Sequence, residues 1–190
     1  MKHPCRTLLC ALALWLLLAG CAARQAMPGP GPVSDGASSA PEAVPSGPVE
    51  EGERYRDFTA PLADGGSFTL SEQEGRVVLL NFWATWCGPC VGELPAFPRL
   101  MEAYGDQLAL VAVNCMEDAA TVRDFLDRNG YTFPVVLDEE GAVSALYPTD
   151  GIPYTVVIGP SGRIAAIQLG ADTADKMYEH YAALIDGMLE

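Results

Sequence analysis

The chain has 190 residues, of which 49% are hydrophobic, which is enough to build the core of one domain. Its formal net charge of −14 at pH 7 disfavours nucleic acids and anionic lipid headgroups as direct partners. Six cysteines, two of them in an N-terminal targeting segment, do not make a dense disulfide framework.

The first 20 residues have the pattern of a secretory signal. A basic start precedes an apolar run over residues 8–19, which is short for a membrane span and suits a signal-peptide core. The run ends in Leu18-Ala19-Gly20-Cys21, which resembles the bacterial lipobox. We therefore expect residues 1–20 to be a lipoprotein signal peptide, and Cys21 to carry lipid that anchors the protein outside a membrane. The alternative is an ordinary secretory signal cut nearby, with Cys21 an incidental thiol.

Residues 22–53 are rich in proline, glycine, serine and alanine and show no hydrophobic periodicity. This composition predicts that the lipidated cysteine is followed by a disordered tether, so that 21–53 form one region. The folded domain is then expected over residues 54–190.

Strands and helices are predicted to alternate through this domain, which indicates an α/β fold. Residues 57–62 and 67–70 flank Asp64-Gly65-Gly66 and predict a β-hairpin. The apolar run over 76–82 predicts a buried strand, and residues 94–104 have helical spacing. Further strands are expected over 108–114, 133–137, 154–158 and 164–169, and further helices around 122–126 and over 142–147 and 173–189.

The helix after the buried strand contains Pro95 and Pro98. A proline inside a helix costs about 3 kcal/mol or more unless the bend is accommodated. We expect the two prolines to lie at a break between a short first helical segment and a longer second one.

The motif Cys87-Gly88-Pro89-Cys90 lies where the buried strand ends and a helix begins. The start of a helix has unpaired N–H groups and a positive dipole end, and both favour a thiolate. Pro89 suits the first helical turn, and Cys90 is one turn from Cys87 and can close a disulfide with it. We expect an exposed Cys87 to attack a partner's disulfide and Cys90 to resolve the mixed disulfide.

Two other interpretations of this motif are a zinc site and an inert structural disulfide. Zinc needs about four ligands, and the other candidates, Cys21, Cys115 and His180, are scattered. An inert structural disulfide is disfavoured by Gly-Pro between the cysteines and by the strand-to-helix setting. We expect no metal and no cofactor.

The stretch from Phe82 to Cys90 resembles the thioredoxin active site, and Cys90-Val91-Gly92-Glu93-Leu94-Pro95 extends the match to the TlpA/ResA-like family of membrane-anchored extracytoplasmic thioredoxins. Gly151-Ile152-Pro153-Tyr154-Thr155 resembles the cis-proline loop of that family. The resemblance covers residues 54–190. It implies a thioredoxin-like fold with a central mixed sheet, an N-terminal β-hairpin and a βα insertion.

The resemblance also implies roles for residues around the cysteines. A cis bond between Ile152 and Pro153 would pack against the disulfide and present backbone groups to a substrate strand; the alternative is a trans turn. Glu93 would tune or relay the proton of the thiols if it is partly buried; otherwise it is an exposed acid at a helix start. We expect Trp86 to belong to the docking surface and Trp83 to the core.

Asn81 is interpreted through the same resemblance, and Cys115 through its own position. Asn81 stands where ordinary thioredoxins have a buried Asp, so a proton-carrying role would fall to Glu93. Cys115, at a strand end, is expected to be a buried inert thiol.

The function we expect is that of a monomeric, lipid-anchored thiol:disulfide oxidoreductase in a bacterial cell envelope. It would reduce disulfides of exported proteins, such as apocytochrome c or a methionine sulfoxide reductase, with electrons from a membrane carrier of the CcdA or DsbD type. The alternatives are a disulfide-forming oxidant, a thiol peroxidase and a lipoprotein that only binds. The peroxidases use a Thr three residues before the reactive Cys, where this chain has Ala84.

Overall fold

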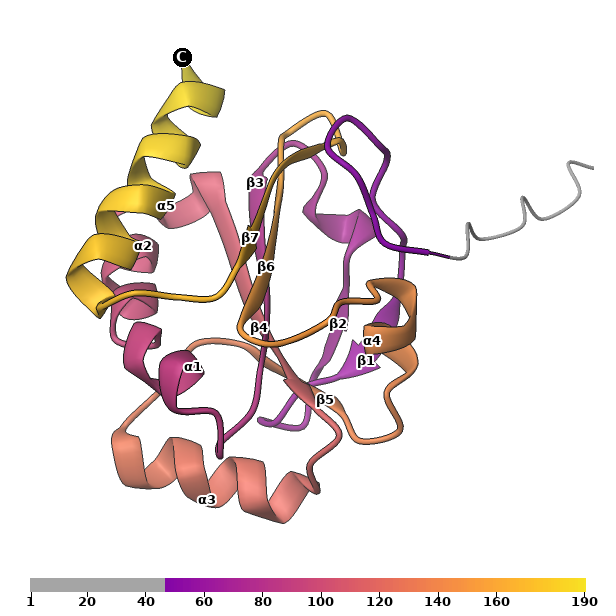
Figure 1. The fold of residues 1–190 in the computed structure, drawn as a ribbon, viewed down its shortest axis with the longest axis vertical. Coiled ribbons are helices and arrows are strands. Elements are labelled where there is room, and N and C mark those ends of the chain that lie inside the picture. The colour runs from indigo at the N-terminus through magenta and orange to yellow at the C-terminus, as the bar shows by residue number, and fades with distance from the viewer. Residues whose placement is uncertain (1–46) are drawn as a thin grey trace, which may run out of the picture. The chain divides into compact units, whose positions relative to one another are not determined.

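A computed structural model describes residues 47–190 of the chain (Figure 1). The predicted signal peptide, the lipidation of Cys21 and most of the predicted tether lie outside the described residues. Within residues 47–190, no helix is long and apolar enough to cross a membrane. Val49 is buried and Gly52 donates a hydrogen bond to Ile164, so the folded part includes residues that composition alone assigned to the tether.

The core of the domain is a five-stranded mixed sheet with the order β5-β4-β3-β6-β7. The first three strands in chain order are parallel, and β6 and β7 run antiparallel to their neighbours. All seven residues of the central strand β3 are buried, as expected from its continuous apolar sequence. The strands are β3 (Val77–Trp83), β4 (Leu108–Cys115), β5 (Val135–Asp138), β6 (Tyr154–Ile158) and β7 (Ile164–Leu169).

Two hydrophobic clusters cover the two faces of this sheet. One packs against helices α1, α2, α3 and α5, and the other against the N-terminal hairpin and the short helix α4 (Figure 1). Because successive strand residues alternate between these clusters, the central strands are largely apolar on both faces. Their buried polar residues are Asn81, Asn114 and Thr155. The helices are α1 (Gly88–Glu93), α2 (Ala96–Tyr104), α3 (Ala119–Asn129), α4 (Ala142–Leu146) and α5 (Ala174–Leu189), with 3₁₀ turns η1 (Ser71–Gln73) and η2 (Gly105–Gln107).

The predicted N-terminal hairpin is present as β1 (Thr59–Pro61) paired antiparallel with β2 (Ser67–Thr69). Residues 52–63, which we call the N-terminal strap, lie across one face of the central sheet. At one end Gly52 donates to the carbonyl of Ile164, and at the other Ala63 donates to the carbonyl of Val135, both at 2.8 Å. The strap therefore touches strands at opposite edges of the same sheet.

The break predicted in the active-site helix occurs at Pro95. Helix α1 ends at Glu93 and α2 begins at Ala96, with Pro95 as its N-cap residue. Pro98 is the third residue of α2, where its missing N–H removes no intrahelical hydrogen bond. Both prolines are thus placed where a helix tolerates them.

Candidate active site

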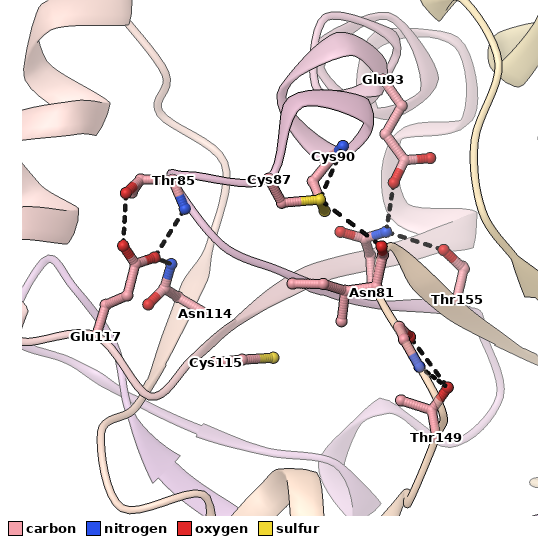
Figure 2. The surroundings of a disulfide bond; sticks show 12 residues. Asn81, Thr85, Cys87, Cys90, Glu93, Asn114, Cys115, Glu117, Thr149 and Thr155 are labelled. Carbon is pink, nitrogen blue, oxygen red and sulfur yellow. Dashed lines mark hydrogen bonds between the residues drawn. A yellow bond between two sulfur atoms is a disulfide. The ribbon is translucent and has the colours of Figure 1, made fainter.

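The two cysteines of the motif form a disulfide at the junction of β3 and α1 (Figure 2). Cys87 is the N-cap residue of α1, and the backbone N–H of Cys90 points at its sulfur with an N–S distance of 3.3 Å. In the dithiol form this N–H would donate to a thiolate at Cys87 and stabilise it. The structure thus confirms the predicted position of Cys87 at the start of a helix.

The accessibility of Cys87 differs from the prediction. Cys87 is only 6% exposed, and Cys90 is fully buried. The reason is the loop before β6, which brings the carbonyl oxygen of Ile152 to 3.7 Å from the Cys87 sulfur. Of the two cysteines, only Cys87 therefore has any surface exposed to solvent.

The loop before β6 contains the cis Ile152–Pro153 bond that the family resemblance implied. Pro153 is buried and Ile152 is half-buried. Ile152 and the 72% exposed Trp86 line a cavity of about 320 Å³ beside the disulfide. Its other walls include Met116 and Tyr147, so an apolar side chain of a bound polypeptide would fit there.

Glu93 is fully buried, so the interpretation of it as an exposed acid at a helix start is wrong. Its carboxyl accepts hydrogen bonds from the Asn81 side-chain amide at 2.9 Å and from the Tyr181 hydroxyl at 3.1 Å. Burial raises the pKa of Glu93 to about 7, and the two hydrogen bonds oppose part of that rise. A carboxyl with this pKa can hold or release a proton near neutral pH, as a general acid or base requires.

The surroundings of Glu93 form a polar network inside the core, in which the side-chain oxygen of Asn81 has no hydrogen-bond partner among the described residues. Thr155 accepts a hydrogen bond from Asn81 at 2.9 Å (Figure 2). The hydroxyls of Thr155 and Tyr181 share another hydrogen bond, also at 2.9 Å. Neither Thr155 nor Tyr181 is marked as a site residue by a pattern in the sequence. The only available signals were the position of Thr155 two residues after Pro153 and a tyrosine on the apolar face of the last helix.

The remaining residues singled out by the sequence fall where they were expected. Trp83 is fully buried and its ring packs against Phe125. Cys115 is buried, and burial raises the pKa of its thiol to about 11, which favours the protonated form at neutral pH. Among residues 47–190 no three His, Cys, Asp or Glu side chains are grouped so that they could hold a metal ion.

A thioredoxin-like fold with a disulfide at the start of α1, faced by a cis-proline loop, defines a thiol-disulfide oxidoreductase. Comparison with known proteins agrees, because residues 52–167 match the family described as the AhpC/TSA family. The chain belongs to this family, in its ResA-like branch.

Characterised relatives support the assignment to this branch. The thioredoxin-like protein YneN of Bacillus subtilis is 38% identical over 132 residues, which are 68% of this chain and 77% of YneN. The thiol-disulfide oxidoreductase ResA of Halalkalibacterium halodurans is 37% identical over 135 residues, 70% of this chain and 76% of ResA.

Solved structures show the same fold. A protein of Chlorobium tepidum assigned as the thiol:disulfide interchange protein DsbE has a TM-score of 0.69 and 31% identity, and the match covers 75% of this chain and 99% of that protein. StoA of Bacillus subtilis has a TM-score of 0.58 and 30% identity, with 71% and 98% covered.

The raised pKa of Glu93 predicts a pH-dependent stability in the oxidised protein. The folded-state pKa of about 7 exceeds the ordinary value of 4.5, so the folded state binds the proton more tightly. The resulting stabilisation is complete below pH 4.5 and is lost as the pH rises through 7. Between pH 5 and 8 the wild type should lose up to about 3 kcal/mol more of its free energy of unfolding than Glu93→Gln, as measured by urea denaturation.

The matched control for this measurement is Glu102→Gln, an exposed acid on α2, which should follow the wild type at every pH. Parallel pH profiles of the wild type and Glu93→Gln would show that the Glu93 carboxyl does not titrate in this range.

Proposed function

We propose that Cys87 is the nucleophile and Cys90 the resolving cysteine in the reduction of client disulfides. The Cys87 thiolate attacks one client sulfur, forms a mixed disulfide and releases the other client sulfur as a thiolate. Cys90 then loses its proton and attacks the Cys87 sulfur, which releases the second client thiol and forms the Cys87–Cys90 disulfide. The client disulfide gains two electrons, and the dithiol of this protein loses them.

The observation that carries this proposal is the placement of the disulfide between the N–H of Cys90 and the cis-proline loop, with Glu93 buried behind it on α1. Glu93 is proposed to accept the proton of Cys90, because its pKa lies near neutral pH. Trp86 and Ile152 are proposed to dock the client chain, and Pro153 to shape the loop that the client meets.

This assignment predicts that a Cys90→Ala variant accumulates mixed disulfides, because nothing then resolves the bond at Cys87. We expect exported proteins to be recovered as adducts that a thiol reductant releases, identified by mass spectrometry after expression of the full chain. A Cys87→Ser, Cys90→Ala double variant is the matched control and should trap nothing. Equal recovery of adducts from both variants would place the reactive thiol elsewhere.

The direction of electron flow is proposed to be reductive, because Gly-Pro between the cysteines is the sequence of thioredoxin itself. We expect the Cys87–Cys90 pair to titrate against a glutathione or dithiothreitol buffer near the thioredoxin value of about −270 mV. A value near about −120 mV would instead identify a disulfide-forming oxidant. A carrier of the CcdA or DsbD type is the proposed donor, since a dithiol that reduces clients outside the cytoplasm must be recharged across the membrane.

The protein is proposed to work as a monomer outside the cytoplasm, held to a membrane by lipid on Cys21. Support comes from the lipobox-like sequence at Leu18–Cys21 and from the family to which the domain belongs. Apocytochrome c and methionine sulfoxide reductases are the proposed clients by family analogy.

Lipidation predicts that a Cys21→Ser variant fails to incorporate labelled fatty acid and leaves the membrane fraction, because the anchoring thioether can no longer form. The wild type and a Cys115→Ser variant should both stay in the membrane fraction and carry label. Unchanged labelling of Cys21→Ser would refute the anchor and leave the domain's chemistry unaffected.

A further inference from the structure

An unusual backbone conformation follows the end of β4. Met116 has φ of 55°, which is left-handed and disfavoured for any residue other than glycine. Strain of this kind persists only where the surrounding structure fixes it, and it concentrates at functional sites. Here it turns the chain so that the next residue, Glu117, reaches back to the loop that carries the active-site cysteine.

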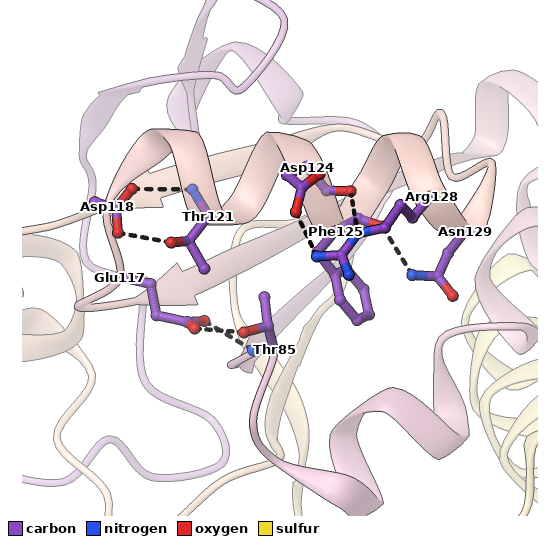
Figure 3. A network of polar contacts seen from close by, with 8 residues as sticks. All are labelled: Thr85, Glu117, Asp118, Thr121, Asp124, Phe125, Arg128 and Asn129. Carbon is purple, nitrogen blue, oxygen red and sulfur yellow. Dashed lines mark hydrogen bonds and ion pairs between the residues drawn. The ribbon is translucent and has the colours of Figure 1, made fainter.

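The Glu117 carboxylate accepts three hydrogen bonds (Figure 2), two of which come from Thr85 in that loop (Figure 3). One oxygen accepts from the backbone N–H of Thr85 and from the side-chain amide of Asn114, both at 2.7 Å. The other oxygen accepts from the Thr85 hydroxyl at 2.5 Å. Within residues 47–190 no ion pair includes Glu117, so its carboxylate is committed to this loop.

These bonds connect the loop to the interior of the sheet. Asn114 is fully buried in β4 and is paired in register with Trp83 of β3. Thr85 is two residues before Cys87, and the intervening turn is closed by the Cys87 N–H bonding to the Ala84 carbonyl at 3.1 Å. Hydrogen bonds thus connect Asn114 of β4 to Glu117 and Glu117 to Thr85, two residues before the cap of α1 (Figure 2).

We propose that Glu117 is a positioning residue that, through Thr85, holds Cys87 where the N–H of Cys90 can stabilise its thiolate. The inference rests on the proposed function, because it concerns the reactivity of the same thiol. Glu117 itself touches neither cysteine in the hydrogen-bond network and acts through the loop. The strained Met116 is explained as the conformation that brings Glu117 to Thr85.

Substitutions at Glu117 separate its geometry from its charge. A glutamine can keep all three hydrogen bonds, because its oxygen can accept from Thr85 N–H and Asn114 while its amide donates to the Thr85 hydroxyl. An aspartate keeps the charge, but its side chain is one methylene shorter and no longer reaches its partners. An alanine loses both the charge and the hydrogen bonds. If Glu117 acts by position, Gln is tolerated and Asp resembles Ala; if it acts by charge alone, Asp is tolerated and Gln resembles Ala.

The experiment measures alkylation of Cys87 by iodoacetamide in the reduced full chain across pH 5–9, with the modified peptide identified by mass spectrometry. For Glu117→Ala and Glu117→Asp we expect the rate at pH 7 to fall about five-fold, the equivalent of one lost hydrogen bond, and the midpoint of the profile to move to higher pH. Glu117→Gln should react at least as fast as the wild type.

Two controls keep this test interpretable. Glu139→Ala removes an acid that bonds only the N–H of Ala119, and it should leave the profile of Cys87 unchanged. Thr85→Val removes the hydroxyl bond alone, and adding Glu117→Ala to it should cost less than Glu117→Ala costs in the wild type. Circular dichroism confirms that each variant is folded before its rate is compared.

Wild-type rates in the Ala and Asp variants would overturn the inference, as would a Gln variant as slow as Ala. A Cys87 that is unreactive in the wild type would overturn the proposed function instead. A reactive wild type with unaffected variants would leave the proposed function standing and remove only the role of Glu117.

Discussion

The buried carboxyl of Glu93 is the point at which four elements of this fold meet. It extends from α1 and is bonded by Asn81 of β3 and Tyr181 of α5, and Thr155 of β6 joins the other two. A carboxyl without water is stable only when its polar atoms are satisfied or its proton is retained. The same group therefore ties the sheet to two helices, and its burial there raises its pKa to about 7. A substitution at this position would change the packing of these elements together with the titration of the carboxyl.

The geometry also favours a thiol-disulfide oxidoreductase over a thiol peroxidase and over a protein that only binds. The position three residues before Cys87 is Ala84, which is fully buried and offers no hydroxyl for a peroxidase. A protein that used this fold only for binding would not need a disulfide in which one cysteine is partly exposed. Nor would it need a buried titratable acid on the same helix. The apolar cavity at Trp86 and Ile152 is open to polypeptide side chains, and only Cys87 of the pair is exposed at all.

Local sequence patterns predicted the elements of the fold. The features that these patterns did not predict depend on contacts between residues far apart in the sequence. Every strand and helix could be placed because apolar runs, turn residues and prolines act on their near neighbours, as the break at Pro95 shows. The buried Glu93 is hydrogen-bonded to Tyr181, which is 88 positions away in the sequence. Thr85 is hydrogen-bonded to Glu117, which is 32 positions away. The shielding of Cys87 by Ile152 across 65 positions is of the same kind. Hydrophobic periodicity does not predict such pairs, because it depends only on residues close together in the sequence.

The N-terminal strap bears on how this domain behaves toward other copies of itself. Its two ends pair with β7 and β5, the strands at the two margins of the sheet. Unpaired strand margins are templates on which a second chain can add and start an aggregate. The strap occupies part of each margin at once, so a cut or deletion within residues 52–63 would lengthen the unpaired margin on both sides of the sheet.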